Sequence, residues 1–315
     1  MKIVFLDETT VTLNDIDFSP LQCLGEYIGY DNSTIEQTLE RAVDADIVIV
    51  NKVLITKHIL EELNNLKLIA VIATGYNNVD IQAAGNKNIR VCNVTGYAAT
   101  TVPQHTFGLI LNLATKAYQY HTDVAAGKWQ QASSFTLLTY PTFELAGKTI
   151  GIIGFGVIGR GVAKIAEGFG MKVLAYDISE IKNSQYKKSD LDVLLRNSDV
   201  ITIHCPLTEK TKNLIEEKAI SKMKKTAILI NTARGGIVDE QALADALNSG
   251  RLAGAGVDVL TKEPPKEGNI LLSAKNIIVT PHSAWSTVQA RQRLVDETAA
   301  NIKAFIEGQP RNIVV

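Results

Sequence analysis

Three ionisable side chains each follow a short apolar run, and parallel strands would bring such positions to one edge of a sheet. They are Arg234 after residues 227–231, Glu263 after residues 254–257 and His282 after residues 277–280. An arginine flanked by glycines can hold a carboxylate with its forked guanidinium. A histidine can give or take a proton near neutral pH, and a nearby carboxylate fixes its tautomer. Together the three residues could hold a small acid and exchange one proton with it.

Each of these residues also has a simpler explanation. Arg234 could be a surface arginine in the loop before a helix, and Glu263, which a double proline follows, could lie in a rigid solvated loop. His282 is favoured for chemistry because Arg234 and Glu263 occupy equivalent strand ends. Solvated or structural positions are expected for the other histidines, which are His58, His105, His121 and His204.

A strand-to-helix turn with fixed glycine spacing lies near the middle of the chain. The apolar run 150–153 is typical of a strand buried on both faces, and apolar residues recur at helical spacing after Gly159. Gly154 permits the tight turn, Gly156 lets the backbone approach a phosphate, and Gly159 lets the helix pack against the strand. The helix N-terminus would face the anion. This turn predicts a dinucleotide site.

A second feature supports the dinucleotide over a glycine-rich turn without a ligand. The strand expected at residues 172–176 ends at Asp177, about twenty residues beyond the turn, where a carboxylate can bind the hydroxyls of the adenosine ribose. Asp177 would repel a 2′-phosphate, and residues 178–180 offer no arginine to receive one. The sequence therefore predicts NAD rather than NADP.

Apolar runs alternate with helical stretches along the chain, which indicates parallel sheets covered on both faces. Further strands are expected at residues 3–6, 47–50, 68–72, 91–94, 200–204, 227–231, 254–257 and 277–280. Helices are expected near residues 21–27, 56–63, 80–87, 100–127, 190–196, 216–223, 239–249 and 287–307, with Thr56 and Asp80 as N-caps. Because the dinucleotide turn usually opens its domain, the four strands before it are assigned to another domain.

The composition excludes several classes of protein. The chain has 315 residues, 46% of them hydrophobic and 21% charged, with a formal net charge of −1. This charge gives no case for nucleic acid or an acidic membrane surface, and no run approaches the length of a membrane span. The three scattered cysteines have no metal-like spacing and fit a reducing compartment. We expect a cytoplasmic protein with no metal.

The ordered motifs resemble the D-isomer-specific 2-hydroxyacid dehydrogenase family over essentially the whole chain. They are the turn 154–159 with Asp177, TARGG around Arg234, Asp258 with Glu263, and PHSAW around His282. The resemblance implies an α/β protein with two doubly wound parallel-sheet domains. Residues 1–99 plus 287–315 would form a flavodoxin-like substrate domain, and residues 100–286 an inserted Rossmann NAD-binding domain. The insertion would explain why the glycine turn comes so late.

The same resemblance implies roles for individual residues. His282 would be the proton donor and acceptor, Glu263 its carboxylate partner and Arg234 the substrate clamp. The pyrophosphate of NAD would lie on Val157 and Ile158, and its nicotinamide end would face Thr232, Ala233 and Asp258. The backbone at Gly75 and Tyr76 would hold the substrate carboxylate, although the family's second glycine in that loop is Asn77 here.

The resemblance also narrows the substrate and the assembly. Segments 51–53, 73–80 and 102–105 look most like the glycerate dehydrogenase, or hydroxypyruvate reductase, branch. A polar group is needed to recognise the substrate hydroxyl, and Lys52 is the candidate for it, with a solvated lysine after a strand as the alternative. Other enzymes of the glyoxylate, D-lactate or phosphoglycerate type stay open, as does a dinucleotide-sensing, corepressor-like binding protein. The apolar segment 129–143 predicts a homodimer, as in family members that dimerise through this region.

Overall fold

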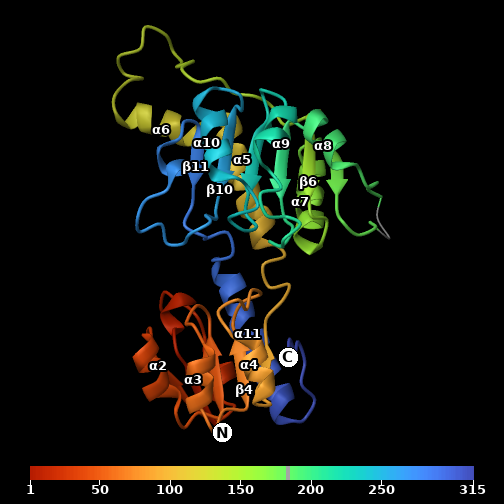
Figure 1. Cartoon of the computed structure of the whole chain (residues 1–315). Helices are drawn as coiled ribbons and strands as arrows, with labels where there is room; N and C mark the ends of the chain where they lie inside the picture. Colours follow the sequence, from red (N-terminus) through yellow and green to blue (C-terminus); the bar gives the residue numbers. More distant parts are fainter. Residues whose placement is uncertain (182–184) are drawn as a thin grey trace. The chain divides into compact units, whose positions relative to one another are not determined.

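A computed structural model of the chain describes residues 1–181 and 185–315. The chain divides into two compact units, unit 1 with Met1–Ala98 and Trp285–Val315, and unit 2 with Ala99–Ala284. The sequence predicted that the first segment of unit 1 ends at residue 99, one residue later than in the structure. It predicted that the second segment begins at residue 287, two residues later than in the structure. Each unit is built on one parallel sheet with helices on its faces (Figure 1).

Unit 1 contains a parallel sheet in the order β2-β1-β3-β4-β5, which is the flavodoxin-like order. Its strands are β1 (Lys2–Phe5), β2 (Glu26–Gly29), β3 (Ile47–Val50), β4 (Leu68–Val71) and β5 (Arg90–Cys92). Its helices are the 3₁₀ turn η1 (Glu8–Thr10), α1 (Ser19–Gln22), α2 (Ile35–Ala42), α3 (Lys57–Glu62), α4 (Ile81–Asn86) and α11 (Val288–Ile306). The flavodoxin-like expectation is therefore confirmed.

Side chains at the helix starts fix where the helices of unit 1 begin. Thr56 accepts a hydrogen bond from the N–H of Ile59, and Asp80 accepts one from the N–H of Ala83. Both N-caps predicted from the sequence are confirmed. Each capping side chain accepts from a backbone N–H group that has no acceptor within the first turn of its helix. Thr34 forms a reciprocal capping box with Gln37 at the start of α2.

The helix expected at residues 21–27 is wrong beyond its first turn. Only α1 forms there, and Glu26–Gly29 become β2, which pairs in parallel with β1 from Lys2 to Phe5. Gly25 permits this pairing, because a Cβ at that position would lie 2.3 Å from the carbonyl oxygen of Met1. Pairing with β1 therefore overrides the local helical pattern, and the sheet has five strands rather than four.

The C-terminal helix explains why both chain ends belong to unit 1. Leu294, Val295, Ala299 and Ile302 of α11 are buried in one core with apolar residues of β1, β3 and β4. Helices α2, α3 and α4 cover the other face of the sheet. After α11 the chain adds a bridge between Ile313 and Cys92 of β5.

Unit 2 contains a second parallel sheet, in the order β11-β10-β9-β8-β6-β7. Its strands are β6 (Thr149–Ile153), β7 (Lys172–Tyr176), β8 (Val200–Ile203), β9 (Ile228–Asn231), β10 (Gly254–Val257) and β11 (Ile277–Val279). Its helices are α5 (Thr101–Thr115), α6 (Ala117–Ala125), α7 (Val157–Gly168), α8 (Leu191–Asn197), α9 (Glu217–Lys222), α10 (Glu240–Asn248) and the 3₁₀ turn η2 (Ile270–Ser273).

The strand order of unit 2 creates a ligand position beside β6. This strand precedes the glycine turn and lies between β7 and β8. The chain moves from β6 to β7 on one side and then to β8 on the other, so the loops at the carboxyl ends separate there. Such switch points are where open α/β sheets bind ligands.

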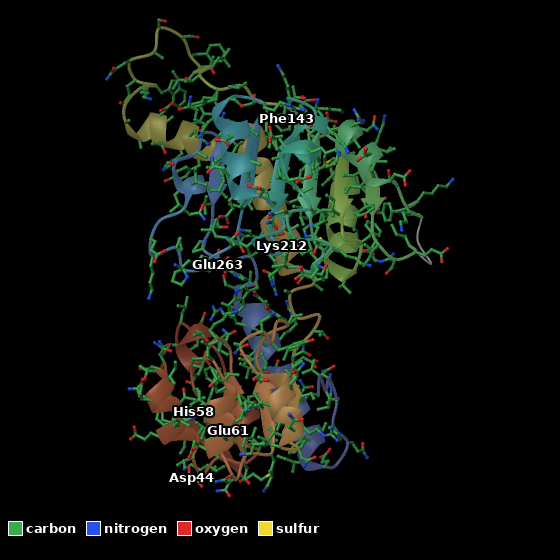
Figure 2. All side chains as sticks on the ribbon, viewed as in Figure 1. Asp44, His58, Glu61, Phe143, Lys212 and Glu263 are labelled. Atoms are coloured by element: carbon green, nitrogen blue, oxygen red, sulfur yellow. The ribbon has the colours of Figure 1, made fainter. Side chains whose placement is uncertain are left out.

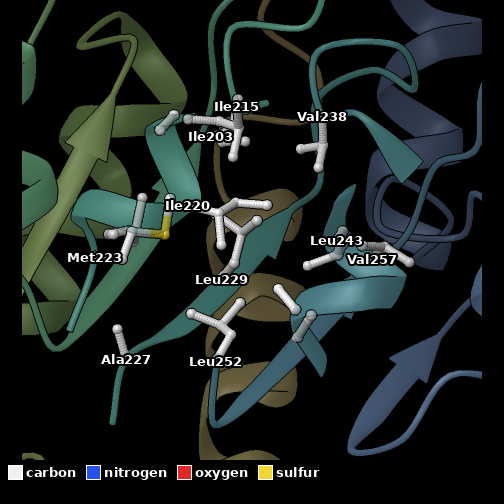
Figure 3. Close-up of a cluster of buried hydrophobic side chains, with 14 of the residues drawn as sticks. Ile203, Ile215, Ile220, Met223, Ala227, Leu229, Val238, Leu243, Leu252 and Val257 are labelled. Atoms are coloured by element: carbon white, nitrogen blue, oxygen red, sulfur yellow. The ribbon is translucent and has the colours of Figure 1, made fainter. Parts of the chain in front are cut away.

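Two apolar cores hold the sheet of unit 2. Helices α5 and α7 pack on one face. Helices α8, α9 and α10 pack on the other face, where Leu229 of β9 and Leu243 of α10 lie in the cluster drawn in Figure 3. Strands β8, β9 and β10 are buried along their whole length, as their apolar runs predict.

The single long helix expected at residues 100–127 is wrong. It is two helices, α5 and α6, separated by Lys116 in the left-handed conformation (φ 56°), whose N–H donates to the carbonyl oxygen of Asn112 and caps α5. Residues 129–144, which we call the arm, contain no helix or strand and extend away from the sheet of their unit (Figure 1). Among the described residues, no helix is both long and apolar enough to cross a membrane.

Candidate active site

His282 and Glu263 form a direct pair at the carboxyl edge of the sheet in unit 2. The Nδ1–H of His282 donates to Oε2 of Glu263 over 2.6 Å, and the N–H of Leu260 donates to Oε1 over 2.7 Å. Both carboxylate oxygens are therefore engaged, which fixes the tautomer of the imidazole and leaves its Nε2 in a position that a proton-transfer role would require. The two side chains are about a third exposed, so a substrate can reach them. Figure 2 labels Glu263 at the edge of the unit opposite Phe143.

A buried carboxylate holds the turn that carries His282. Asp258, 1% exposed, accepts hydrogen bonds from the hydroxyl of Thr280 over 2.5 Å and from the N–H groups of Ser283 and Ala284 over 2.9 Å each. His282 itself has φ 53° and donates its N–H to the carbonyl oxygen of Asp258. Non-glycine residues seldom adopt this left-handed conformation, so the bonds around Asp258 maintain it.

Arg234 lies on the neighbouring loop, after β9. The side chain of Asn231 braces this loop by donating to the carbonyl oxygen of Arg234 and accepting from the N–H of Ala233. The next residue packs against the loop after β10, because a Cβ at Gly235 would lie 2.1 Å from the carbonyl carbon of Leu260. The Arg234 side chain is exposed and donates to the carbonyl oxygen of Ala233 over 2.7 Å. Unit 2 thus brings the loops of Arg234, Glu263 and His282 to one edge.

The glycine turn fits a dinucleotide. Gly154 has φ 90°, and a Cβ there would lie 2.4 Å from the backbone nitrogen of Cys205. A Cβ at Gly159 would lie 2.2 Å from the carbonyl oxygen of Gly154. At Gly156, the N-cap of α7, a Cβ would meet nothing within 4 Å. The first and third glycines are therefore required by packing, while the second leaves open space where a phosphate would approach the helix N-terminus.

Other residues expected to contact NAD line the same strand ends. Asp177 follows β7 and accepts hydrogen bonds from the N–H of Phe155 over 2.7 Å and of Ser179 over 2.9 Å. These bonds hold its carboxylate beside the glycine turn. Val157 is exposed and Ile158 half-buried in the first turn of α7. The hydroxyl of Thr232, just before Ala233, is 3.1 Å from that of Thr106 on α5.

The residues expected to hold the substrate lie in unit 1. Lys52 follows β3 and is exposed, while Gly75 and Tyr76 follow β4 and are half-buried. Asn78 joins these two loops, because its side-chain nitrogen donates to the carbonyl oxygen of Val53 over 2.9 Å. The two loops thus form one edge of the unit 1 sheet.

The remaining histidines have the surroundings expected of them. His58 and His121 are exposed. Nε2 of His105 is 3.1 Å from the hydroxyl of Thr280, and Nε2 of His204 is 2.9 Å from that of Thr202. Burial lowers the pKa of His204 to about 3 and keeps it neutral. Within the described part of the chain, no three or more His, Cys, Asp or Glu side chains gather as a metal site would require.

Sequence reasoning missed two positioning contacts at this edge, the hydroxyl of Thr280 on Asp258 and the N–H of Leu260 on Glu263. The first contact could have been suspected from the sequence, because Thr280 directly precedes Pro281 at the end of the strand. The second involves a backbone donor, which every residue type carries, so no residue type could have indicated it.

Comparison with known proteins indicates the same family as the sequence motifs. Residues 107–284 match the model of the NAD-binding domain of D-isomer-specific 2-hydroxyacid dehydrogenases. The chain is 45% identical to a glycerate dehydrogenase of Methylorubrum extorquens, over 99% of this chain and 98% of that one. It is 41% identical to a hydroxypyruvate reductase of Blautia hydrogenotrophica, over 100% and 99% of the two chains.

A solved structure extends the likeness to the whole fold. An acyclic imino acid reductase in complex with NADPH and D-Arg superposes with a TM-score of 0.88 at 31% identity, covering all of both chains. The two parallel-sheet units agree with the family that the sequence motifs indicate. The chain belongs to the D-isomer-specific 2-hydroxyacid dehydrogenase family, whose members are NAD-dependent oxidoreductases acting on the CH–OH group of D-2-hydroxy acids.

Proposed function

We propose that this dehydrogenase reduces hydroxypyruvate to D-glycerate with NADH. The observation that carries the chemistry is the His282–Glu263 pair, with Nε2 of the imidazole left for the substrate. The substrate is supported by the two relatives, a glycerate dehydrogenase and a hydroxypyruvate reductase, which are 45% and 41% identical over nearly the full length.

The residues of unit 2 divide the reaction between them. NADH, when bound, supplies a hydride to the keto carbon of the substrate. His282 gives a proton to the keto oxygen, so that the carbonyl becomes a hydroxyl. Before the transfer, Glu263 stabilises the protonated imidazole. After the transfer, the neutral imidazole takes up a new proton from solvent before the next turnover. Arg234 binds the substrate carboxylate with a charge that does not titrate.

The residues of unit 1 would select the substrate. We assign the substrate carboxylate to the backbone at Gly75 and Tyr76, and the hydroxyl on the third carbon to Lys52. A polar group placed for that hydroxyl is left without a partner when pyruvate binds, which costs about 1–3 kcal/mol. This difference is what would distinguish hydroxypyruvate from pyruvate.

A substrate panel tests the proposal. We expect kcat/KM with NADH to be highest for hydroxypyruvate and lower for glyoxylate, and to fall at least about tenfold for pyruvate and for a branched 2-keto acid. If pyruvate or the branched acid exceeded hydroxypyruvate by tenfold, the enzyme would be of the lactate or hydroxyisocaproate type.

We also propose that the enzyme is a cytoplasmic homodimer joined through the arm. Phe135 and Leu138 are each 89% exposed, and Trp129 is 52% exposed. The arm keeps a defined shape, since the indole N–H of Trp129 donates to the carbonyl oxygen of Phe135 and the Tyr140 hydroxyl donates to Asp123. An ordered segment with this much apolar surface supports an interface. The three free cysteines support a reducing compartment.

A further inference from the structure

Asp7 is a buried carboxylate for which the proposed chemistry has no use. It follows β1 and is 1% exposed. Its Oδ1 accepts from the N–H of Asn51 over 2.8 Å, and its Oδ2 accepts from the N–H of Lys52 over 2.6 Å and of Val53 over 3.1 Å. Three successive backbone donors of the loop after β3 therefore converge on one side chain.

A second set of bonds ties the same loop to the backbone of Asp7. The side-chain nitrogen of Asn51, which is 4% exposed, donates to the hydroxyl of Thr10 over 3.0 Å. That hydroxyl donates to the carbonyl oxygen of Asp7 over 2.6 Å. The backbone of Asn51 thus binds Asp7 directly, and its side chain binds Asp7 through the hydroxyl of Thr10. These bonds fix the start of the loop.

The loop held by Asp7 in turn holds the loop after β4. Asn78 donates from its side chain to the carbonyl oxygen of Val53, and its own carbonyl oxygen accepts from the N–H of Ile55 over 2.8 Å. The N–H of Val79 donates to the carbonyl oxygen of Tyr76 over 3.1 Å. A continuous path of hydrogen bonds therefore leads from Asp7 through residues 51–55 to the loop of Gly75 and Tyr76.

The carboxylate is what makes this arrangement strong. Hydrogen bonds from N–H groups to an ionised acceptor are about twice as strong as neutral ones, and here the acceptor is excluded from water. Burial raises the pKa of Asp7, while the three N–H donors and the charge of Lys52 oppose that rise. An asparagine would offer one oxygen and would direct an NH₂ group at backbone N–H groups, leaving buried donors without partners.

We propose that Asp7 is a positioning residue for the substrate: its carboxylate fixes Lys52 directly, and fixes Gly75 and Tyr76 through Asn78. The inference rests on the proposed function, because that function assigns these three residues to substrate binding. Groups that bind the substrate equally in the ground state and the transition state raise KM, and leave kcat nearly unchanged, when they lose their positions. The hydrogen bonds of Asp7 lead to the residues assigned to the keto acid, so we expect its loss to weaken binding of the keto acid and to leave binding of NADH unchanged.

The test is Asp7→Asn in the full-length enzyme, with Asp46→Asn as the matched control. Asp46 also accepts from a backbone N–H, that of Lys2 over 2.9 Å, and from the ammonium of Lys67, but it precedes β3 and lies at the opposite edge of the same sheet. We expect Asp7→Asn to raise KM for hydroxypyruvate about tenfold, with kcat changed less than about threefold and the Kd of NADH unchanged. Asp46→Asn should leave all three constants unchanged.

A second variant keeps the test decisive if Asp7→Asn does not fold. Asn78→Ala removes only the side-chain bond to Val53 and should raise KM for hydroxypyruvate while the Kd of NADH stays the same. An unchanged KM in the folded variants overturns the inference, and so does an equal rise in Asp46→Asn. Failure of the proposed function would be seen differently, as a wild-type enzyme that prefers another keto acid. The KM ratio would then be measured with that acid.

Discussion

At His282 the backbone adopts a left-handed conformation that is uncommon outside glycine, and the surrounding bonds show why it persists there. Asp258 accepts from the two residues after His282, while Glu263 holds the imidazole by Nδ1. One carboxylate thus fixes the backbone and the other fixes the ring. The sequence indicated the residue types at this site, but not that Asp258 would be engaged by the His282 turn.

Replacing His282 should remove the proton transfer and leave cofactor binding intact. We expect His282→Ala to lower kcat for hydroxypyruvate by about 10²-fold or more, the range for general acid–base catalysis, with no change in the Kd of NADH. Glu263→Gln keeps an acceptor for Leu260 but loses the charge, so its kcat should fall less. Steady-state kinetics would check both, with the exposed His58→Ala as control. An undiminished kcat in a folded His282→Ala would contradict the assignment.

Asp177 should favour NADH over NADPH by at least about tenfold in kcat/KM, or about 1.4 kcal/mol. Its carboxylate is fixed beside the glycine turn and would repel a 2′-phosphate. Residues 178–180 contain no arginine, but the ammonium of Lys188 lies 3.3 Å from the carbonyl oxygens of Ile178 and Ser179. For this reason we expect a preference and not exclusion. Asp177→Asn should raise the NADPH-to-NADH ratio, and equal efficiency of the wild type with both cofactors would refute this role.

At the scale of elements, helix starts and buried strands were predictable because their signals are local. Thr56, Asp80 and the apolar run of β3 each indicate structure within a few residues. Strand β2 was not predictable, because Glu26–Gly29 become a strand only by pairing with β1. The break at Lys116 was also missed, since a lysine in the left-handed conformation carries no residue-type signal.

The glycine turn gives a prediction at the same scale. Gly156→Ala should leave the fold unchanged, because its Cβ meets nothing within 4 Å, yet should raise the Kd of NADH about tenfold by filling the space of a phosphate. Gly168→Ala, at the other end of α7 and equally uncrowded, is the matched control and should change neither property. Fluorescence titration and thermal unfolding would check these variants. Wild-type affinity in Gly156→Ala would mean that no phosphate lies there.

At the scale of the whole molecule, the arm should join two chains. Light scattering at micromolar concentration should give about twice the chain mass of 34.2 kDa. A double variant with Phe135→Asp and Leu138→Asp should give the mass of one chain, because it places charges in the apolar surface. Leu13, which lies in unit 1, is 80% exposed. The variant Leu13→Asp therefore serves as the control and should stay dimeric. A wild-type monomer would rule out the proposed assembly.

The proposed enzyme uses NADH as reductant and hydroxypyruvate as substrate, and it forms a D-configured product. All three are measured together when wild-type enzyme is incubated with NADH and hydroxypyruvate and the glycerate formed is resolved by chiral chromatography. We expect oxidation of NADH to match formation of D-glycerate mole for mole, with no L-glycerate. Formation of L-glycerate, or NADH binding without turnover of any 2-keto acid, would contradict the claim. The second result would instead indicate a dinucleotide-sensing protein.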